Sequence, residues 1–308
     1  MTITLRRLVT GAPRAAIGLV LLLPLAHIAR AQRDDDYRSR LDTTLALDKS
    51  GTVSITNRSG EIIVSGWARN EVRVHATSES DNIRFDATQN RVSLEVGGYR
   101  GHGETRFEVT VPYGARVLAR AQSGDLSIRG TKGEVEATSQ SGDLTIEDVE
   151  GHLEVNSLSG DLRVRGVHGD MAVNLISGDM TLDDASGNVD ITTVSGDISM
   201  RGIVSKSVRA KTTSGDVSYD GTIDRAGRYE FAAHSGDVGL SIPRDASAQL
   251  TVSTWNGDIE SEFPITLAPG EHGIGSATAK RFTFDIGGGG GARVIAESFS
   301  GDITIRRR

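Results

Sequence analysis

A three-residue motif, Ser-Gly-Asp, returns through this chain at a fixed interval, and this repeat constrains the fold more than any other feature. The motif begins every eighteen residues in the middle of the sequence and then continues at wider intervals. Its starting positions are Ser123, Ser141, Ser159, Ser177, Ser195, Ser214, Ser235 and Ser300, with Asn-Gly-Asp from Asn256. Glycine also recurs at half of this period. The sequence unit is therefore about nine residues, and two units form one structural period.

Apolar and polar residues alternate after each glycine, as they do in a strand with one buried face. When the periods are aligned, the apolar residues fall into columns that we expect to point into the core. The columns after the triplet are Leu126, Leu144, Leu162, Met180 and Ile198, then Ile128, Ile146, Val164, Leu182 and Met200. The half-period strand gives Val135, Leu153, Met171 and Val189, then Ala137, Val155, Val173 and Ile191. Positions near the corners add Val149, Val167, Ala185 and Ile203, and also Leu158, Ile176 and Val194.

One period cannot fold alone, because about six inward side chains do not offset the entropy lost on ordering eighteen residues. Identical columns can instead stack on neighbouring periods about 4.8 Å apart, as in a solenoid. An outward column that alternates in sign supports this register, since stacked neighbours then pair opposite charges. Its members are Arg129, Glu147, Arg165, Asp183 and Arg201. We predict an all-β fold, a single-chain β-solenoid or β-roll with about 18 residues, in two short strands, per rung.

The first 31 residues have the pattern of a cleavable secretory signal. Arg6, Arg7 and Arg14 precede the apolar run 15–26, which is shorter than the roughly 20 residues that span a bilayer. We expect cleavage after Ala31 and no transmembrane segment in the mature chain. Retention of the segment as an N-terminal anchor is the alternative.

After the signal we expect four segments. Residues 32–41 form a charged, flexible leader, and residues 42–121 form the N-terminal β region of the stack. Residues 122–222 form the regular solenoid of 18-residue repeats, and residues 223–308 form an irregular β region that completes the stack. Terminal repeats are generally atypical, so we predict less regular β caps at both ends.

Composition excludes several classes of chemistry and partner. The chain has no cysteine, which excludes disulfides, thiolate catalysis and a lipid attached to an N-terminal cysteine. Its formal net charge is −7, from 34 basic and 41 acidic residues. Without the four arginines of the signal, 30 basic residues face 41 acidic ones, a net charge of −11. An acidic chain without a long basic run disfavours nucleic acid and anionic lipid as partners.

Three stretches, together with the Ser-Gly-Asp series, resemble a known family. They are residues 109–128, 241–264 and 288–307, and they look like the bacterial "putative adhesin" domain of unknown function, a family of exported or membrane-attached β-strand-repeat proteins. The likeness extends from about residue 42 to residue 308. It implies an elongated β-stack at the cell envelope without a recognised catalytic site. The wide triplet spacing within residues 223–299 departs from the regular pattern and leaves the docking of the last strands open.

The triplet itself is either a site or a turn. A serine nucleophile needs a positioned base, and no histidine recurs with the triplets, so we interpret the triplet as a rung corner. Calcium binding is the alternative, because nonapeptide β-rolls bind Ca²⁺. One glycine per unit and few oxygen ligands argue against it. The stacked aspartates repel one another unless N–H groups or cations compensate: Asp125, Asp143, Asp161, Asp179 and Asp197. Circular dichroism with and without a chelator distinguishes the two interpretations.

Other chemistry-bearing residues favour structural interpretations. His152 and His168 can approach each other on adjacent rungs, but they lack metal-ligand spacing and we expect them to be exposed. The glycine-rich run 286–292 lacks the Gly-Lys-Ser/Thr ending of a phosphate loop, so we expect it to connect to the last strand. Neighbouring carboxylates are expected to point to opposite faces of a strand, which excludes acid/base pairs. These are Glu147 with Asp148 and Asp183 with Asp184.

Aromatic residues could form a glycan-stacking platform if they converged, but we expect them to pack separately at the irregular ends. They are Trp67, Trp255, Tyr99, Tyr113 and Tyr229. We predict no catalytic, cofactor-binding or metal-binding residues.

We therefore expect a non-enzymatic exported protein of the periplasm, outer surface or medium. It would be an adhesin or scaffold that binds a surface, glycan or partner protein through a repetitive β surface. Self-association is also open, because an uncapped solenoid end can stack. The alternatives are a calcium-dependent secreted β-roll and a polysaccharide-active β-helix enzyme.

Overall fold

The computed structural model describes residues 39–79, 82–97, 103–264 and 280–308. All 25 assigned elements in this part of the chain are β-strands, which confirms the all-β prediction. The predicted signal peptide and residues 32–38 of the predicted leader lie outside the described residues. Strand β1 (Ser39–Ala46) begins at Ser39, so the end of the predicted leader is part of a strand.

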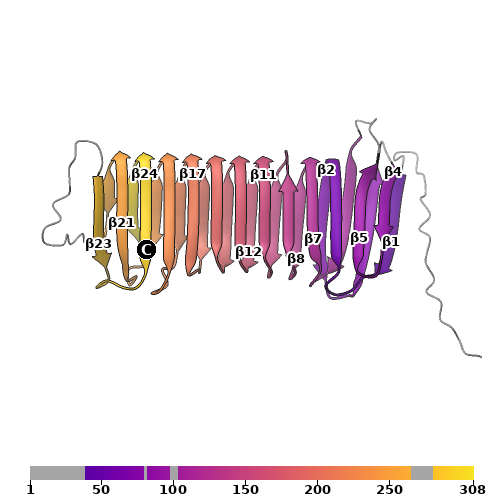
Figure 1. The fold of residues 1–308 in the computed structure, drawn as a ribbon, viewed down its shortest axis with the longest axis horizontal. Helices are drawn as coiled ribbons and strands as arrows, with labels where there is room; N and C mark the ends of the chain where they lie inside the picture. The colour runs from indigo at the N-terminus through magenta and orange to yellow at the C-terminus, as the bar shows by residue number, and fades with distance from the viewer. Residues whose placement is uncertain (1–38, 80–81, 98–102, 265–279) are drawn as a thin grey trace, which may run out of the picture.

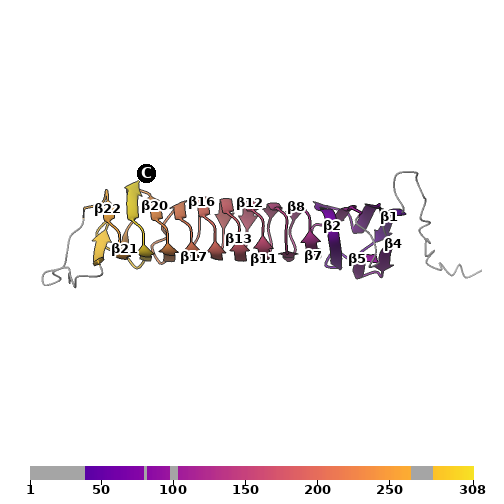
Figure 2. The ribbon, with the colours of Figure 1, turned by 90° about the horizontal axis from the view of Figure 1, so that it is seen from above.

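The centre of the molecule is a stack of rungs, each made of two strands on opposite faces (Figures 1 and 2). Strands pair in parallel with the strand two places along the chain. The offset is eighteen residues as far as β16, so that Leu144 lies opposite Leu162 and Leu162 opposite Met180, and it is nineteen for the last two pairs. This confirms the predicted solenoid. Its strands are β7 (Arg116–Ser123), β8 (Leu126–Thr131), β9 (Val135–Ser139), β10 (Leu144–Val149), β11 (Leu153–Ser159), β12 (Leu162–His168), β13 (Met171–Ser177), β14 (Met180–Ser186), β15 (Val189–Ser195), β16 (Ile198–Ile203), β17 (Ser207–Ser214) and β18 (Val217–Gly221).

The core lies between the two faces and is built from the predicted columns. All residues of the four strand columns are buried, as are Val149, Val167, Ala185 and Ile203 near one corner. Each buried side chain packs against the same position of the rungs on either side, because the ladders are parallel and in register. Burial is therefore shared along the stack, as the repeat requires.

One predicted core column points toward solvent instead. Leu158, Ile176 and Val194 are 57%, 52% and 46% exposed, so the prediction is wrong for these three. Side chains alternate along a strand, and the preceding position already points inward. The residues at that buried position are Ser157, Leu175 and Thr193.

In the C-terminal rungs, small hydroxyl side chains at this buried position bind the backbone of the neighbouring corner. Thr254 Oγ1 donates to the carbonyl oxygen of Gly301 at 2.9 Å, and Ser298 Oγ donates to that of Gly236 at 2.9 Å. Each bond joins one rung to the next. A polar side chain therefore occupies a core position with its hydrogen bond satisfied.

The glycine of each triplet forms a corner at which backbone packs directly on backbone. Gly160 has φ 113°, a conformation that disfavours other residues. A Cβ atom on Gly160 would lie 2.1 Å from the carbonyl oxygen of Gly142 in the rung below. The interpretation of the triplet as a rung corner is confirmed, and the motif repeats because this contact repeats.

The N-terminal end changes from parallel to antiparallel pairing. Strand β2 (Thr52–Trp67) forms a whole rung, because its first half pairs with β7 and its second half with β8. On its other side lie β5 (Arg91–Gly97) and β6 (Thr105–Pro112), in parallel. Antiparallel strands follow: β4 (Asn82–Ala87) on β5, β3 (Glu71–Ser78) on β6, and β1 on β3. This end is therefore an atypical β cap.

At the opposite end the rungs do not follow sequence order. Strand β24 pairs with β19 on one side and β21 on the other, and β25 pairs likewise with β20 and β22. Figure 1 shows yellow β24 between β21 and β17, inside the stack. Strand β23 covers β21 in antiparallel orientation. The elements are β19 (Arg228–Ser235), β20 (Val238–Ile242), β21 (Ala248–Asn256), β22 (Ile259–Ser261), β23 (Lys280–Ile286), β24 (Arg293–Ser300) and β25 (Ile303–Arg307).

Two buried tyrosines hold the longer corners that appear where the triplet spacing exceeds eighteen. Tyr219 Oη donates to the carbonyl oxygen of Thr222 at 2.7 Å, and Tyr229 Oη donates to that of Ser205 at 2.5 Å. Burial raises the pKa of both phenols above the usual value. Both hydroxyls therefore stay protonated and serve as donors.

The alternating outward charges lie in the predicted register but do not form close ion pairs. Glu147 lies opposite Arg129 on one side and Arg165 on the other. Within the described residues, no ion pair within 4.0 Å joins these side chains. Ion pairs between rungs occur elsewhere on the surface, such as Lys132 with Glu150 at 2.7 Å. Exposed pairs of this kind contribute only about 0–1 kcal/mol, so they do not hold the stack together.

Replacing Gly160 by alanine should destabilise the protein by about 2 kcal/mol or more, because the new Cβ meets a backbone oxygen at a strained φ. Gly239→Ala is the matched control: a Cβ at Gly239 would have no neighbour within 4 Å. We expect that variant to stay within about 0.5 kcal/mol of the parent. Denaturant unfolding followed by circular dichroism measures both, and equal stabilities would contradict the corner assignment.

Tyr219→Phe should cost about 1 kcal/mol at pH 7, because the Thr222 carbonyl loses its donor. The raised pKa also predicts a pH effect. The unfolded phenol loses its proton near pH 10, whereas the folded one keeps it, so higher pH favours unfolding. Parent stability should therefore fall above about pH 10, and fall less steeply in the variant. Melting temperatures from pH 7 to 11 test this, and identical slopes would contradict it.

Candidate binding surface and relation to known proteins

One long edge of the stack carries the triplet corners, and the residue before each triplet points outward along it. The pairing register aligns these residues in one column. Gln122 and Gln140 make its N-terminal part polar. The remainder, which we call the apolar edge, is Leu158, Ile176, Val194, Thr213, His234, Phe299 and Trp255, in stacking order.

Three rings at the end of the apolar edge stack on one another. The ring centroids of His234 and Phe299 are 4.8 Å apart, and those of Phe299 and Trp255 are 5.9 Å apart, each with planes 14° apart. Rings this close cannot lie side by side in one plane, so they face each other and turn their edges to solvent. Phe299 and Trp255 remain 49% and 51% exposed. The inserted strand β24 supplies the middle ring.

Next to the apolar edge, the triplet aspartates form a hydrogen-bonded ladder. Oδ1 of Asp179 accepts a bond from the backbone N–H of Asp197 at 2.9 Å, and the same bond joins each successive pair. These backbone donors offset part of the repulsion between the stacked carboxylates. The ladder runs through Asp125, Asp143, Asp161, Asp179, Asp197, Asp216, Asp237, Asp302 and Asp258.

Much of this ladder carries uncompensated negative charge. Ion pairs occur where Arg163 approaches Asp161 at 3.5 Å and where Lys280 approaches Asp258 at 2.5 Å. The Lys280 hydrogen bond and charge lower the pKa of Asp258. Among the residues that the structure describes, no cationic side chain lies within 4.0 Å of Asp179, Asp197, Asp216, Asp237 or Asp302. A row of negative charge therefore flanks the apolar edge.

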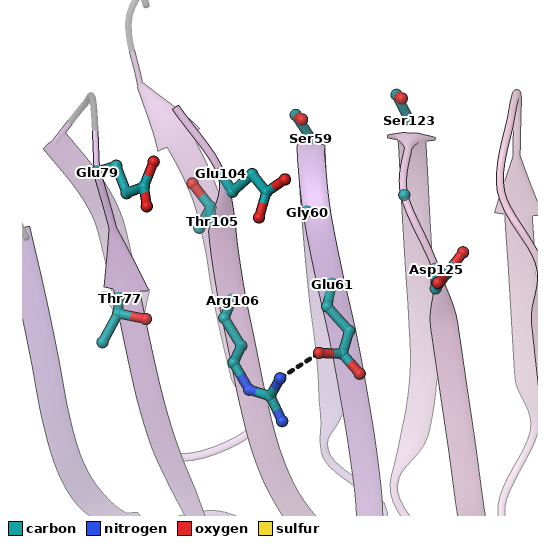
Figure 3. A pocket seen from close by; sticks show the side chains of 11 residues that line it. Ser59, Gly60, Glu61, Thr77, Glu79, Glu104, Thr105, Arg106, Ser123 and Asp125 are labelled. Carbon is teal, nitrogen blue, oxygen red and sulfur yellow. Dashed lines mark hydrogen bonds and ion pairs between the residues drawn. The ribbon is translucent and has the colours of Figure 1, made fainter. Parts of the chain in front are cut away.

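A polar hollow of about 590 Å³ lies at the N-terminal end of the same edge (Figure 3). The first two corners line it, with Glu79, Glu104 and Arg106 from neighbouring strands. In Figure 3, Arg106 points toward Glu61, with which it forms an ion pair. None of the described residues that line the hollow is aromatic. Clustered carboxylates and stacked aromatics thus lie at opposite ends of the edge.

A second hollow of about 600 Å³ lies at the other corner, where the longer connections protrude. Val204 and Ile223 give it an apolar wall, and Lys206, Asp224 and Arg225 add charges of both signs. Val204 is 60% exposed. This mixture does not indicate one class of ligand.

The histidines considered from the sequence are exposed and do not form a metal site. His168 Nδ1 lies 2.9 Å from Ser186 Oγ. The register places His152 beside Asp170, so the two histidines are not stacking partners. In the part of the chain that the structure describes, no group of three or more His, Asp or Glu side chains could hold a metal ion.

The adjacent carboxylates do not point to opposite faces of a strand, so that part of the prediction is wrong. Asp148 has φ 54° and Asp184 has φ 55°, so each adopts a left-handed conformation that interrupts the alternation of the strand. Both Glu147 and Asp148 therefore lie outside the core, between buried Ile146 and Val149. Asp183 and Asp184 repeat this arrangement. The left-handed residue breaks the alternation of side chains at this point, and the neighbouring rungs make the same turn, with Gly130 and Gly166 at φ 66°.

The aromatic residues named from the sequence do not converge. Trp67 Nε1 donates to the carbonyl oxygen of Glu71 at 2.6 Å, and Tyr113 packs beside Lys132. Tyr229 is buried. Trp255 joins the apolar edge, and Tyr99 lies outside the described residues. Sequence reasoning missed His234 and Phe299, although the position before the triplet would have revealed both.

The glycine-rich run 286–292 connects β23 to β24, as predicted. Gly287, Gly288 and Gly289 all have positive φ. Ser247 Oγ donates to the carbonyl oxygen of Gly289 at 2.7 Å and also lies 3.0 Å from that of Gly287. The run is therefore a turn that only glycine forms without strain.

A family model described as Toastrack DUF4097 matches residues 86–306, well over half of the chain. The chain belongs to this family. The match confirms the resemblance inferred from the Ser-Gly-Asp series, and the Toastrack assignment covers the regular stack and the inserted rung. No curated protein matches the chain. No helix among the described residues is long and apolar enough to cross a membrane.

Solved structures with some similarity to this Toastrack chain share little sequence with it. A "putative lipid binding protein" from Parabacteroides distasonis is 8% identical, with a TM-score of 0.46, over 86% of this chain and 95% of that one. A "putative adhesin" from the same organism is 11% identical, with a TM-score of 0.42, over 87% and 96%. A "putative adhesin" from Bacteroides fragilis is 11% identical, with a TM-score of 0.35, over 88% and 98%.

Proposed function

We propose that this protein is a non-enzymatic adhesin or scaffold of the bacterial cell envelope that binds its partner along the apolar edge. The observation that carries the proposal is the row of exposed apolar and aromatic side chains, which occupy every rung of the apolar edge except that of Thr213. Contiguous exposed apolar surface on a soluble protein generally marks an interaction site. The signal pattern in residues 1–31 supports export to the envelope.

The rung spacing makes the edge multivalent. Its side chains recur about every 4.8 Å, so an elongated partner contacts several of them at once. Each side chain gives at most about 1.5–3 kcal/mol on full burial, and these half-exposed ones give less. Binding strength then comes from the number of rungs covered rather than from one contact.

The negative charge of the aspartate ladder indicates which classes of partner can bind beside it. Five consecutive carboxylates of the ladder, from Asp179 to Asp302, have no ion pair among the described residues and follow the apolar edge from Ile176 to Phe299. This charge repels nucleic acid and anionic surfaces, and it attracts cationic groups. A partner protein with apolar and basic side chains fits best, and a neutral glycan is compatible.

The separation of candidate catalytic groups supports a role without catalysis. The carboxylates of the hollow, including Glu79 and Glu104, lie at one end of the edge, whereas Trp255 and Phe299 lie at the other. A polysaccharide-cleaving groove would need both together. His234 precedes a triplet serine, but its ring stacks on Phe299.

Replacing Ile176 and Phe299 together by serine should weaken binding to isolated cell envelopes at least tenfold, a loss of about 1.4 kcal/mol. Val204→Ser is the matched control, because Val204 is at least as exposed as Ile176 and Phe299 but lies on the other corner. Its binding should stay within twofold of the parent. The measurement is sedimentation of the labelled mature protein with envelopes, after circular dichroism confirms folding. Equal binding by the double variant and the control would overturn the proposal.

A further inference from the structure

The rung formed by β24 and β25 fills a slot whose two walls come earlier in the sequence. One wall is β19 with β20, and the other is β21 with β22. From β9–β10 to β19–β20, every rung lies beside the rung that precedes it in the chain. Both walls of the slot therefore precede, in the sequence, the strands that fill it.

The two walls also match each other. Ala296 lies opposite Phe231 on one side and Val252 on the other, so β21 could pair with β19 directly and place Phe231 against Val252. The triplet spacing agrees, since Ser235 to Asn256 is twenty-one residues, the same as one rung earlier. The two walls could thus pair directly with each other if the β24–β25 rung did not lie between them.

A glycine hinge leads into the inserted rung. Strand β23 stays paired with β21, and the chain then passes through Gly287–Gly291 before β24 begins at Arg293. Three of these glycines have positive φ, and glycine can adopt other conformations at little cost. Five residues extend to roughly 17 Å, which is enough to redirect β24 into a neighbouring molecule.

We propose that the slot also accepts the β24–β25 rung of a second copy of this chain, so that two copies exchange rungs and form a dimer. Exchange of an identical element keeps every native contact, and only the hinge changes its path. It takes place during folding, when the walls exist and the rung has not yet entered. A partner's rung then competes with the chain's own.

The contacts that would hold an exchanged rung are those that hold it within one chain. Asp302 N–H donates to Asp237 Oδ1 at 2.7 Å, and Asp258 N–H donates to Asp302 Oδ1 at 2.7 Å. Phe299 stacks between His234 and Trp255. All of these partners lie on the walls. The slot therefore recognises a strand–corner–strand segment with a Gly-Asp corner and an aromatic residue before the triplet.

Cysteine cross-linking tests the exchange, because the chain has no cysteine of its own. Ala232 in β19 lies directly opposite Glu297 in β24, and both side chains point outward. The Ala232→Cys and Glu297→Cys variants are unfolded, mixed and refolded together, then oxidised. A disulfide between two chains forms at this site when β24 of one copy lies beside β19 of the other. Glu154→Cys mixed with Glu297→Cys is the matched control, since β11 lies rungs away on the same face.

We expect the Ala232→Cys and Glu297→Cys mixture to give at least tenfold more mixed disulfide than the control, in a fraction that rises with protein concentration. The double variant should form the bond within one chain at high dilution, which checks the register. Mixed disulfide no greater than in the control, at every concentration, would overturn the proposal. Failure of the diluted double variant to cross-link would also overturn it, because β24 would not lie beside β19.

Discussion

The contact of one corner glycine on the next is the interaction on which the rest of the structure depends. The carbonyl oxygen of Gly142 lies where a side chain on Gly160 would begin, so the corners stack as bare backbone. This close approach lets both faces keep their ladders in one register. The aspartate that follows each glycine adds a side-chain bond to the next rung, as Asp143 does to Asp161. Although the chain has no disulfides, a hydrogen bond therefore joins adjacent rungs at each of these corners.

The same corner decides which side chains meet solvent. Two positions before the corner glycine, the side chain points outward on every rung, because the preceding position points into the core. In the N-terminal part this outward position holds glutamine, and farther along it holds Leu158, Ile176, Val194 and the stacked rings. The fold therefore creates the proposed binding edge on any such stack. The residue at this one position of each rung decides whether the edge is polar or apolar. The aspartate row beside it comes from the corner itself.

Much of the fold could be predicted from the sequence, because a strict period of eighteen fixes the register once strands are assumed. The core columns through Leu144 and Ile146 follow from alternation alone. Residue type alone places the apolar Leu158 in the core, whereas alternation from Val155 places it outside, and the structure follows the alternation. The left-handed conformation of Asp148 does have a signal in its column, because glycine fills the same position in the neighbouring rungs and aspartate also tolerates this conformation.

The order of the last rungs and the aromatic stack could not be predicted. Triplet spacing locates the corners of β21 and β24 but does not say which one lies next to β19. Phe299 meets His234 and Trp255 only because β24 enters the stack between them. Long-range order of this kind depends on the competition between alternative strand pairings, and both pairings are compatible with the local pattern.

The most direct test of the stacked-rung account is the distance between two spin labels on one outward column. Cysteines at Ser127 and Ser218 take the labels, since the register runs through Thr145, Arg163, Thr181 and Ser199 between them. Five steps of about 4.8 Å predict a backbone separation of about 24 Å, although the two sites are ninety-one positions apart in the sequence. Pulsed electron–electron double resonance should give a narrow distribution of label-to-label distances near that value. A broad distribution, or one centred beyond about twice that distance, would contradict the account.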